Sequence, residues 1–166
     1  MKVQEAFDEV RKLAAAMPDM FSQVHIELAF DKGGRRAIGD RTDSEDPGFL
    51  IRGDGIGSQS GLYFFTCSQG QIIYIGKATK NNLHERVWDH VKTPEHDTGG
   101  VWVFPKHCFR AEPEAAEYEA EVLNGKAGLG VITFSDPEVV SLAEVYLHTV
   151  HLKRHKKLPL FNKQIG

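Results

Sequence analysis

The sequence predicts a mixed α+β domain, in which an antiparallel β-sheet is flanked by helices. The chain has 166 residues, 41% hydrophobic and 26% charged, which is enough to bury a core. Two β-rich runs, 61–68 and 71–78, are separated only by a short turn, as in a hairpin. Apolar residues at helical spacing occupy 3–17 and 135–155, which indicates a helix near each end of the chain.

Composition argues against a membrane span and against a secreted disulfide scaffold. No apolar run approaches the roughly 18 residues of a transmembrane helix, and the first residues alternate charged with apolar side chains, unlike a signal peptide. Cys67 and Cys108 form no CxxC pair, which favours free thiols in a reducing compartment. We therefore expect a cytoplasmic protein without a membrane partner.

The first sixty residues form an extension in this interpretation. Residues 3–17 predict an amphipathic helix, and 24–30 predict a short strand. Residues 31–60 are rich in Gly, Asp, Ser and Arg and have a poor apolar pattern, which predicts a long loop. We place a domain boundary near Ser60, between an N-terminal helix and loop at 1–60 and a main domain at 61–166.

The hairpin makes a specific prediction about two tyrosines. If Gln69-Gly70 is a two-residue turn, Phe65 lies opposite Tyr74 and Tyr63 lies opposite Gly76. Tyr63 and Tyr74 are then diagonal neighbours on one face, roughly 7 to 8 Å apart. A three-residue loop would break this register.

The next helix begins after Asn82, which suits an N-cap with Glu85 at the third helical position. Leu83 and Val87 give this helix a buried stripe. Arg86 and His90, four residues apart, share the flank beside that stripe.

The remaining elements follow in the order strand, helix, strand, helix. We predict a strand at 101–105, an acidic surface helix at 112–124 and a strand at 129–134. The last helix begins with Ser135-Asp136-Pro137-Glu138 and runs to about His155. Glu144 lies at the edge of its apolar side, where a carboxylate is half desolvated unless something pairs with it.

Charge is unevenly distributed along the chain. The net charge of −3 divides into +5 for residues 148–166, which contain no acid, and −8 for the rest. This basic tail is either a solvated helix end or a surface for DNA phosphates. The candidate DNA contacts in it are Lys153, Arg154, Lys156 and Lys157.

Histidines offer two further interpretations. His148, His151 and His155 form a ladder beside Glu144, at a spacing that suits either a metal site or a basic face touching DNA; we favour the basic face. A zinc site built from His96, His107 and Cys108 is an alternative without a paired cysteine motif to support it.

A series of motifs follows in a fixed order from residue 61 onward. Gly61-Leu62-Tyr63 is followed after ten residues by Tyr74-Ile75-Gly76-Lys77, then by Arg86 and His90. A glutamate on a later helix, Glu144, and an asparagine after a proline, Asn162, complete the series. In this order the motifs resemble the GIY-YIG nuclease superfamily, over about 61–166. The resemblance implies a small three-stranded antiparallel sheet flanked by helices, to which this chain adds an N-terminal helix.

The implied activity is hydrolysis of a DNA phosphodiester with one Mg²⁺ or Mn²⁺ ion. The resemblance gives Glu144 the role of metal ligand and Arg86 that of neutralising the phosphate. It makes Tyr63 the general base and lets Tyr74 hydrogen-bond the phosphate or the water. A free tyrosine titrates near about pH 10, so neighbouring cations have to lower its pKa.

Three further residues complete the implied catalytic set. Lys77 would support the same anion, and His90 would contact the phosphate or relay a proton. Asn162 would brace the site from the closing loop. The resemblance therefore implies a metal-dependent endonuclease that acts on duplex or branched DNA, and we expect it to act alone, as a homodimer or with a partner subunit.

Each assignment has a structural alternative. The tyrosines could be ordinary strand aromatics, Arg86 and His90 a surface pair, and Glu144 the salt-bridge partner of His148 or His151. The whole domain could be a non-catalytic nucleic-acid-binding module that retains the fold. A protein-interaction domain that uses the acidic helix at 112–124 is a third possibility.

Overall fold

A computed structural model describes residues 1–30, 35–37, 55–91, 95–96, 102–103, 121 and 126–166. Most of the predicted loop at 31–60 and nearly all of the predicted helix at 112–124 lie outside these residues, as do His107 and Cys108. Among the described helices, none is both long and apolar enough to cross a membrane.

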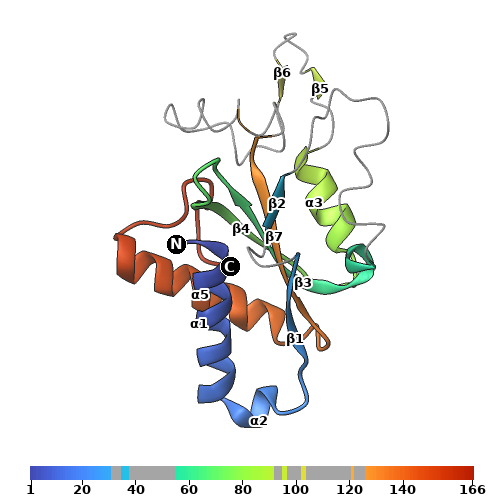
Figure 1. The fold of residues 1–166 in the computed structure, drawn as a ribbon, viewed down its shortest axis with the longest axis vertical. Coiled ribbons are helices and arrows are strands. Elements are labelled where there is room, and N and C mark those ends of the chain that lie inside the picture. Colours follow the sequence, from blue (N-terminus) through green and yellow to red (C-terminus); the bar gives the residue numbers. More distant parts are fainter. Residues whose placement is uncertain (31–34, 38–54, 92–94, 97–101, 104–120, 122–125) are drawn as a thin grey trace.

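The fold is α+β, as predicted, and its centre is an antiparallel sheet with strand order β1-β7-β3-β4 (Figure 1). A further strand, β2, also pairs with β7, so the sheet has five strands. The strands are β1 Ile26–Ala29, β2 Arg35–Ala37, β3 Ser60–Thr66, β4 Ile72–Ala78 and β7 Gly128–Phe134. The three-stranded sheet that we predicted is wrong, because β1 and β2 fill the second edge of β7.

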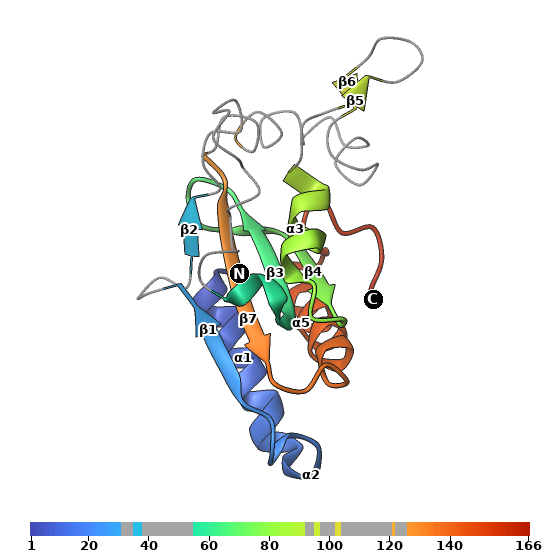
Figure 2. The same cartoon turned by 90° about the vertical axis from the view of Figure 1, so that its right-hand side faces the viewer.

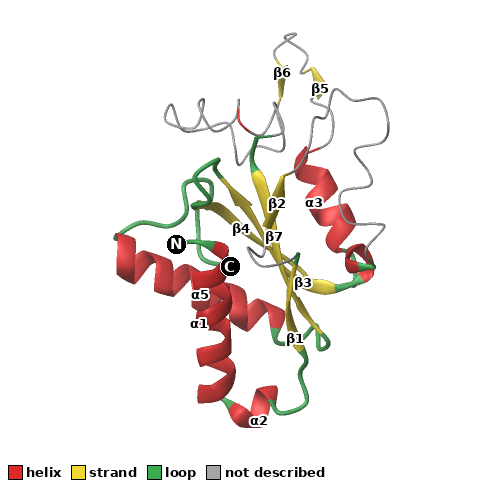
Figure 3. Cartoon of the chain, viewed as in Figure 1, coloured by secondary structure: helices red, strands yellow, loops and turns green. Residues whose placement is uncertain are grey.

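The helices and short elements complete the described chain (Figures 2 and 3). They are α1 Val3–Ala16, α2 Pro18–Phe21, η2 Ile56–Ser58, α3 Leu83–Val91, α5 Val140–His155 and the strand pair β5 Glu95–His96 with β6 Trp102–Val103. The last helix begins later than predicted, because Asp136 Oδ1 accepts the Glu138 N–H at 2.8 Å and forms a turn first.

The hairpin between β3 and β4 has a three-residue loop, so the predicted two-residue turn is wrong. The Gly70 N–H donates to Cys67 O at 2.8 Å, and the Cys67 N–H donates to Gln71 O at 3.0 Å. Gly70 has φ of 80°, the left-handed conformation that glycine adopts without strain. A type I turn followed by a glycine in this conformation is a common three-residue hairpin loop.

The predicted register of the tyrosines is nevertheless confirmed. Phe65 pairs with Tyr74 and Tyr63 with Gly76, because a β-bulge next to Phe65 leaves Ile73 as an extra residue on β4. Compared with a two-residue turn, the three-residue loop shifts the pairing of the two strands by one residue. The extra residue of the bulge shifts the pairing back. The rings of Tyr63 and Tyr74 are 6.0 Å apart, centroid to centroid, on one face of the sheet.

Two hydrophobic cores cover the two faces of the sheet. On one face, α1 and α5 pack on Leu62, Phe64 and Ile75. On the other face, Leu83 and Val87 of α3 pack on the side of the sheet that carries Tyr63 and Phe65, next to Phe161 of the closing loop. The boundary near Ser60 divides the sequence, but α1 and β1 share this sheet and core with the residues after it.

A buried carboxylate links α1 to α5. Glu9 is 6% exposed, and its Oε1 accepts Lys12 Nζ at 2.7 Å and Arg154 Nη2 at 2.5 Å. Tyr146 Oη donates to the other oxygen at 3.2 Å. The Lys12 hydrogen bond, helped by Arg154 and opposed by burial, lowers the pKa of Glu9. The N-terminal helix is therefore held to the C-terminal helix by charge as well as by packing.

We expect Glu9→Gln to lower the free energy of unfolding by about 1–2 kcal/mol at pH 7. Because the folded-state pKa lies below the ordinary value of 4.5, the carboxylate contributes fully above that pH and less as the pH falls further. Urea unfolding at pH 7 and pH 3 should show the difference from the native chain shrinking in acid. Glu27→Gln, at an exposed position, is the control, and an equal difference at both pH values would contradict the prediction.

Candidate functional site

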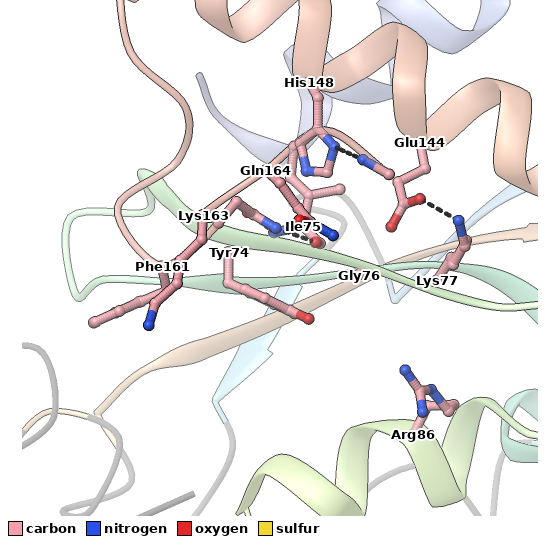
Figure 4. Close-up of a pocket in the computed structure, with 12 residues that line it drawn as sticks. Tyr74, Ile75, Gly76, Lys77, Arg86, Glu144, His148, Phe161, Lys163 and Gln164 are labelled. Atoms are coloured by element: carbon pink, nitrogen blue, oxygen red, sulfur yellow. Dashed lines mark hydrogen bonds and ion pairs between the residues drawn. The ribbon is translucent and has the colours of Figure 1, made fainter. Parts of the chain in front are cut away.

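A pocket of about 510 Å³ lies at the free edge of β4 and brings together residues from four parts of the chain (Figure 4). Its walls come from β4, α3, α5 and the segment after α5. It is lined by Tyr74, Ile75, Gly76, Lys77, Arg86, Glu144, His148, Phe161, Asn162, Lys163, Gln164 and Gly166. Five of the seven predicted catalytic residues, namely Tyr74, Lys77, Arg86, Glu144 and Asn162, are among them.

The alternation of side chains along β4 explains how both faces of the sheet contribute to one pocket. Tyr74 lies on the α3 side, with Tyr63 and Phe65, whereas Ile75 packs on the α5 side. Lys77, two residues after Ile75, reaches α5. Because β4 is an edge strand, side chains from its two faces meet around its free edge.

Glu144 is held by a lysine. Its Oε2 accepts Lys77 Nζ at 2.6 Å, and the Glu144 side chain is 7% exposed against 33% for Lys77. A buried carboxylate needs a partner of opposite charge, and here the partner comes from β4. The alternative of a salt bridge to His148 or His151 is therefore wrong, because Lys77 lies opposite Glu144 on the same face of the sheet.

Arg86 stands on the other side of the pocket. Its side chain extends from α3 and lies on the opposite side of β4 from Glu144 and Lys77 (Figure 4). Arg86 is exposed, whereas His90, one turn later on the same helix, is 4% exposed. The two residues that we expected to share a flank thus have different environments, because α3 turns His90 toward the sheet.

Tyr63 and His90 form a buried pair behind the pocket. Tyr63 is fully buried, and its Oη lies 3.0 Å from His90 Nε2. The rings of Phe65 and Tyr74 lie within 6.0 Å of Tyr63, centroid to centroid. Neither Tyr63 nor His90 lines the pocket, but the Tyr63 ring lies against Gly76, which does.

Gly76 is the glycine that this arrangement requires. A Cβ at Gly76 would overlap the Tyr63 ring at Cε2, Cζ and Oη. The hydroxyl of Tyr63 therefore reaches the pocket wall only because residue 76 has no side chain. The position of the Tyr63 ring therefore depends on a glycine at residue 76.

Asn162 fastens the closing loop to the edge of the sheet. Its Oδ1 accepts the Ile75 N–H at 2.8 Å, and its Nδ2 donates to Ile75 O at 2.8 Å. Just before it, the Phe161 N–H donates to Ile73 O at 3.0 Å. The side-chain amide thus takes the place of a neighbouring strand, which protects an edge that would otherwise expose its hydrogen-bonding groups.

One basic residue of the tail at 148–166 forms an ion pair with α1. Lys153, Lys156 and Lys157 are exposed at the end of α5. Arg154 instead bonds Glu9 on α1. Of the four predicted DNA contacts, Arg154 thus has an ion-pair partner within its own chain.

The histidine ladder does not form a common face. His148 is 1% exposed and lines the pocket, and His151 is 6% exposed and bonds Lys157 O through Nδ1 at 2.8 Å. His155 is exposed. Burial lowers the pKa of both His148 and His151. The favoured interpretation of three imidazoles on one exposed basic face is wrong, because His148 and His151 are buried and only His155 of the three is exposed.

Among the residues that line the pocket, Glu144 supplies the one side-chain carboxylate that could bind a metal ion. In the described part of the chain, no three His, Cys, Asp or Glu side chains gather where they could hold a metal ion. Mg²⁺ is usually held by one or two carboxylates together with water and substrate phosphate oxygens. Glu144, buried at the pocket wall, fits that pattern, with its Oε2 already bonded to Lys77.

Sequence reasoning missed several residues of the pocket, namely Phe161, Lys163, Gln164 and Gly166. His148, which also lines the pocket, was placed beside Glu144 from its spacing but was not assigned to the catalytic set.

Comparison of the chain with protein-family models, with curated proteins and with solved structures finds no match.

We expect Gly76→Ala to displace the Tyr63 ring and to lower the free energy of unfolding by about 1–3 kcal/mol. In a Tyr63→Leu background the same substitution should cost little, which gives a coupling energy of about 1 kcal/mol or more. Tyr63→Phe, which keeps the ring, is the control and should retain the cost. Urea unfolding of the variants measures each value, and additive effects of Gly76→Ala and Tyr63→Leu would contradict the packing argument.

We expect Asn162→Ala to speed hydrogen exchange at the Ile75 amide and to cost about 1–2 kcal/mol of stability. Asn162→Asp should also destabilise, because a carboxylate oxygen would face the Ile75 carbonyl in place of the amide N–H. Exchange measured residue by residue checks both variants. The neighbouring exposed Lys163→Ala should leave Ile75 unchanged, and full protection of Ile75 in Asn162→Ala would refute the role of the amide.

Proposed function

We propose that the protein is a metal-dependent DNA endonuclease of GIY-YIG type. The observation that carries the proposal is the single pocket lined by Tyr74, Lys77, Arg86, Glu144 and Asn162. These residues come from a strand, two helices and a loop that are as far as 88 positions apart in the sequence. Their convergence at one pocket supports a shared role better than the structural alternatives for each residue do.

The charges of the pocket suit a phosphodiester. The ammonium of Lys77 and the guanidinium of Arg86 lie on either side of the β4 edge, and Arg86 is exposed to a ligand. Hydrolysis builds negative charge on phosphorus oxygens, and fixed cations stabilise that charge. Guanidinium is suited to this task because it stays charged and can bind two oxygens at once.

Glu144 is the residue that would hold the divalent ion. When bound, Mg²⁺ or Mn²⁺ supplies Lewis-acid stabilisation of the phosphate and activation of water. Lys77 competes for the same carboxylate, since its ammonium occupies Oε2 in this structure. Cation and phosphate binding would then release Lys77 from Glu144 toward the anion.

Tyr74 lines the pocket and can hydrogen-bond a phosphate oxygen or the attacking water. Tyr63 meets the pocket at Gly76, with its hydroxyl bonded to His90. We propose that His90 holds this hydroxyl and accepts its proton, so that Tyr63 serves as the base. The exposed Lys153, Lys156 and Lys157 would then contact phosphates along duplex or branched DNA outside the pocket.

Cleavage of supercoiled plasmid and of a branched oligonucleotide with Mg²⁺ or Mn²⁺ tests the proposal. We expect Glu144→Gln and Arg86→Ala each to lower the rate by about 100-fold or more, because each removes a charge that acts on the reacting phosphate. Glu138→Gln and Arg11→Ala, at exposed positions outside the pocket, are matched controls that should cleave like the native chain.

Two outcomes would overturn the nuclease proposal. Cleavage that survives in both pocket variants would place the activity elsewhere or in a contaminant. Salt-sensitive DNA binding without any metal-dependent cleavage would identify the non-catalytic binding module instead. Thermal unfolding of every variant shows whether a lost activity reflects a lost fold.

A further inference from the structure

His148 is a buried group that the proposed mechanism does not use. It lies one helical turn after Glu144 on α5, is 1% exposed and lines the same pocket. Its Nε2 is buried and makes no hydrogen bond within the part of the chain that the structure describes. Buried polar groups nearly always have a partner, so such an atom at a pocket wall calls for one.

The other ring nitrogen, Nδ1, lies 3.5 Å from the Gly166 N–H, at the long end of the hydrogen-bond range. With Nδ1 as the acceptor of this N–H, the ring proton is on Nε2. Burial lowers the pKa of His148, and the Glu144 carboxylate and a side-chain hydrogen bond with Asn162 oppose that shift. In this tautomer the imidazole offers an N–H donor at the pocket wall.

The pocket wall near His148 carries cationic side chains that suit an anion. Lys77, which bonds Glu144, and Lys163 both line the same pocket. The neighbours of His148 in the pocket wall include Lys163 and Gln164, both exposed (Figure 4). A ligand that displaces these two solvent-exposed side chains would meet Nε2 and bring Lys163 beside itself.

We propose that His148 binds phosphate, donating its Nε2–H to a non-bridging oxygen of the phosphodiester in the pocket. This inference rests on the proposed function for the identity of the ligand. It gives α5 a second role in the same pocket, because one helix face then carries the carboxylate for the cation and, one turn later, an N–H donor for the anion.

The first experiment uses NMR to determine which ring nitrogen of His148 carries the proton and whether Nε2 contacts a phosphate. The full chain is labelled with ¹⁵N-histidine, and long-range ¹H–¹⁵N spectra are recorded in EDTA, with His148→Gln used for assignment. We expect the Nε2–H tautomer for His148 and the opposite, Nδ1–H tautomer for His151, which bonds the Lys157 carbonyl. Adding a short DNA duplex, or inorganic phosphate, should shift His148 Nε2 and leave the exposed His25 unchanged.

The second experiment measures DNA affinity in EDTA, where no cleavage occurs. His148→Leu removes the donor and should weaken binding about tenfold, since a hydrogen bond to a charged oxygen is lost. His148→Gln restores an N–H at similar reach and should bind within about threefold of the native chain. Thermal unfolding of both variants identifies any loss that comes from misfolding.

The outcomes separate this inference from the proposed function. DNA binding with an unchanged His148 signal and full affinity in His148→Leu overturns the inference alone, as does an Nδ1–H tautomer. A shift with inorganic phosphate but no DNA binding supports the phosphate contact and overturns the nuclease proposal. Absence of any shift or binding with either probe overturns both.

Discussion

Everything in the candidate site depends on the register of β4 against β3. Side chains of a strand alternate between the faces of the sheet, so a slip of one residue would exchange the groups on the two faces. Lys77 would then leave Glu144, and Tyr74 would leave Tyr63. The β-bulge beside Phe65 keeps the register despite a hairpin loop of three residues. The β-bulge therefore helps to place the side chains of the candidate site.

The position of β4 at the edge of the sheet is the second constraint. A central strand would be covered on both sides, and α3 and α5 would stay separated by the sheet. At the edge, Arg86 from one face and Glu144 from the other line the same pocket. The free hydrogen-bonding groups of such an edge need protection, and Asn162 provides it at Ile75. The closing loop thus protects the strand and forms a wall of the pocket.

In the part of the chain that the structure describes, two carboxylates are buried, those of Glu9 and Glu144. Glu9 joins the terminal helices through Lys12 and Arg154, which serves the fold. Among the described residues, Glu144 forms an ion pair with Lys77 alone, and it lines a pocket. The difference is physical: several partners fix a carboxylate in a structural role, whereas a single exchangeable partner leaves it able to bind something else.

The sequence by itself determined the α+β class, the hairpin and the terminal helices, because these follow from local periodicity and turn chemistry. The pairing of Tyr63 with Gly76 was predicted from a two-residue turn, and it holds because a β-bulge offsets the three-residue loop. The sequence also predicted five residues of the pocket through their order in the chain. Only the tertiary structure decided the partner of Glu144, the burial of His148 and the five-stranded sheet. These depend on contacts between residues far apart in sequence, which no local pattern encodes.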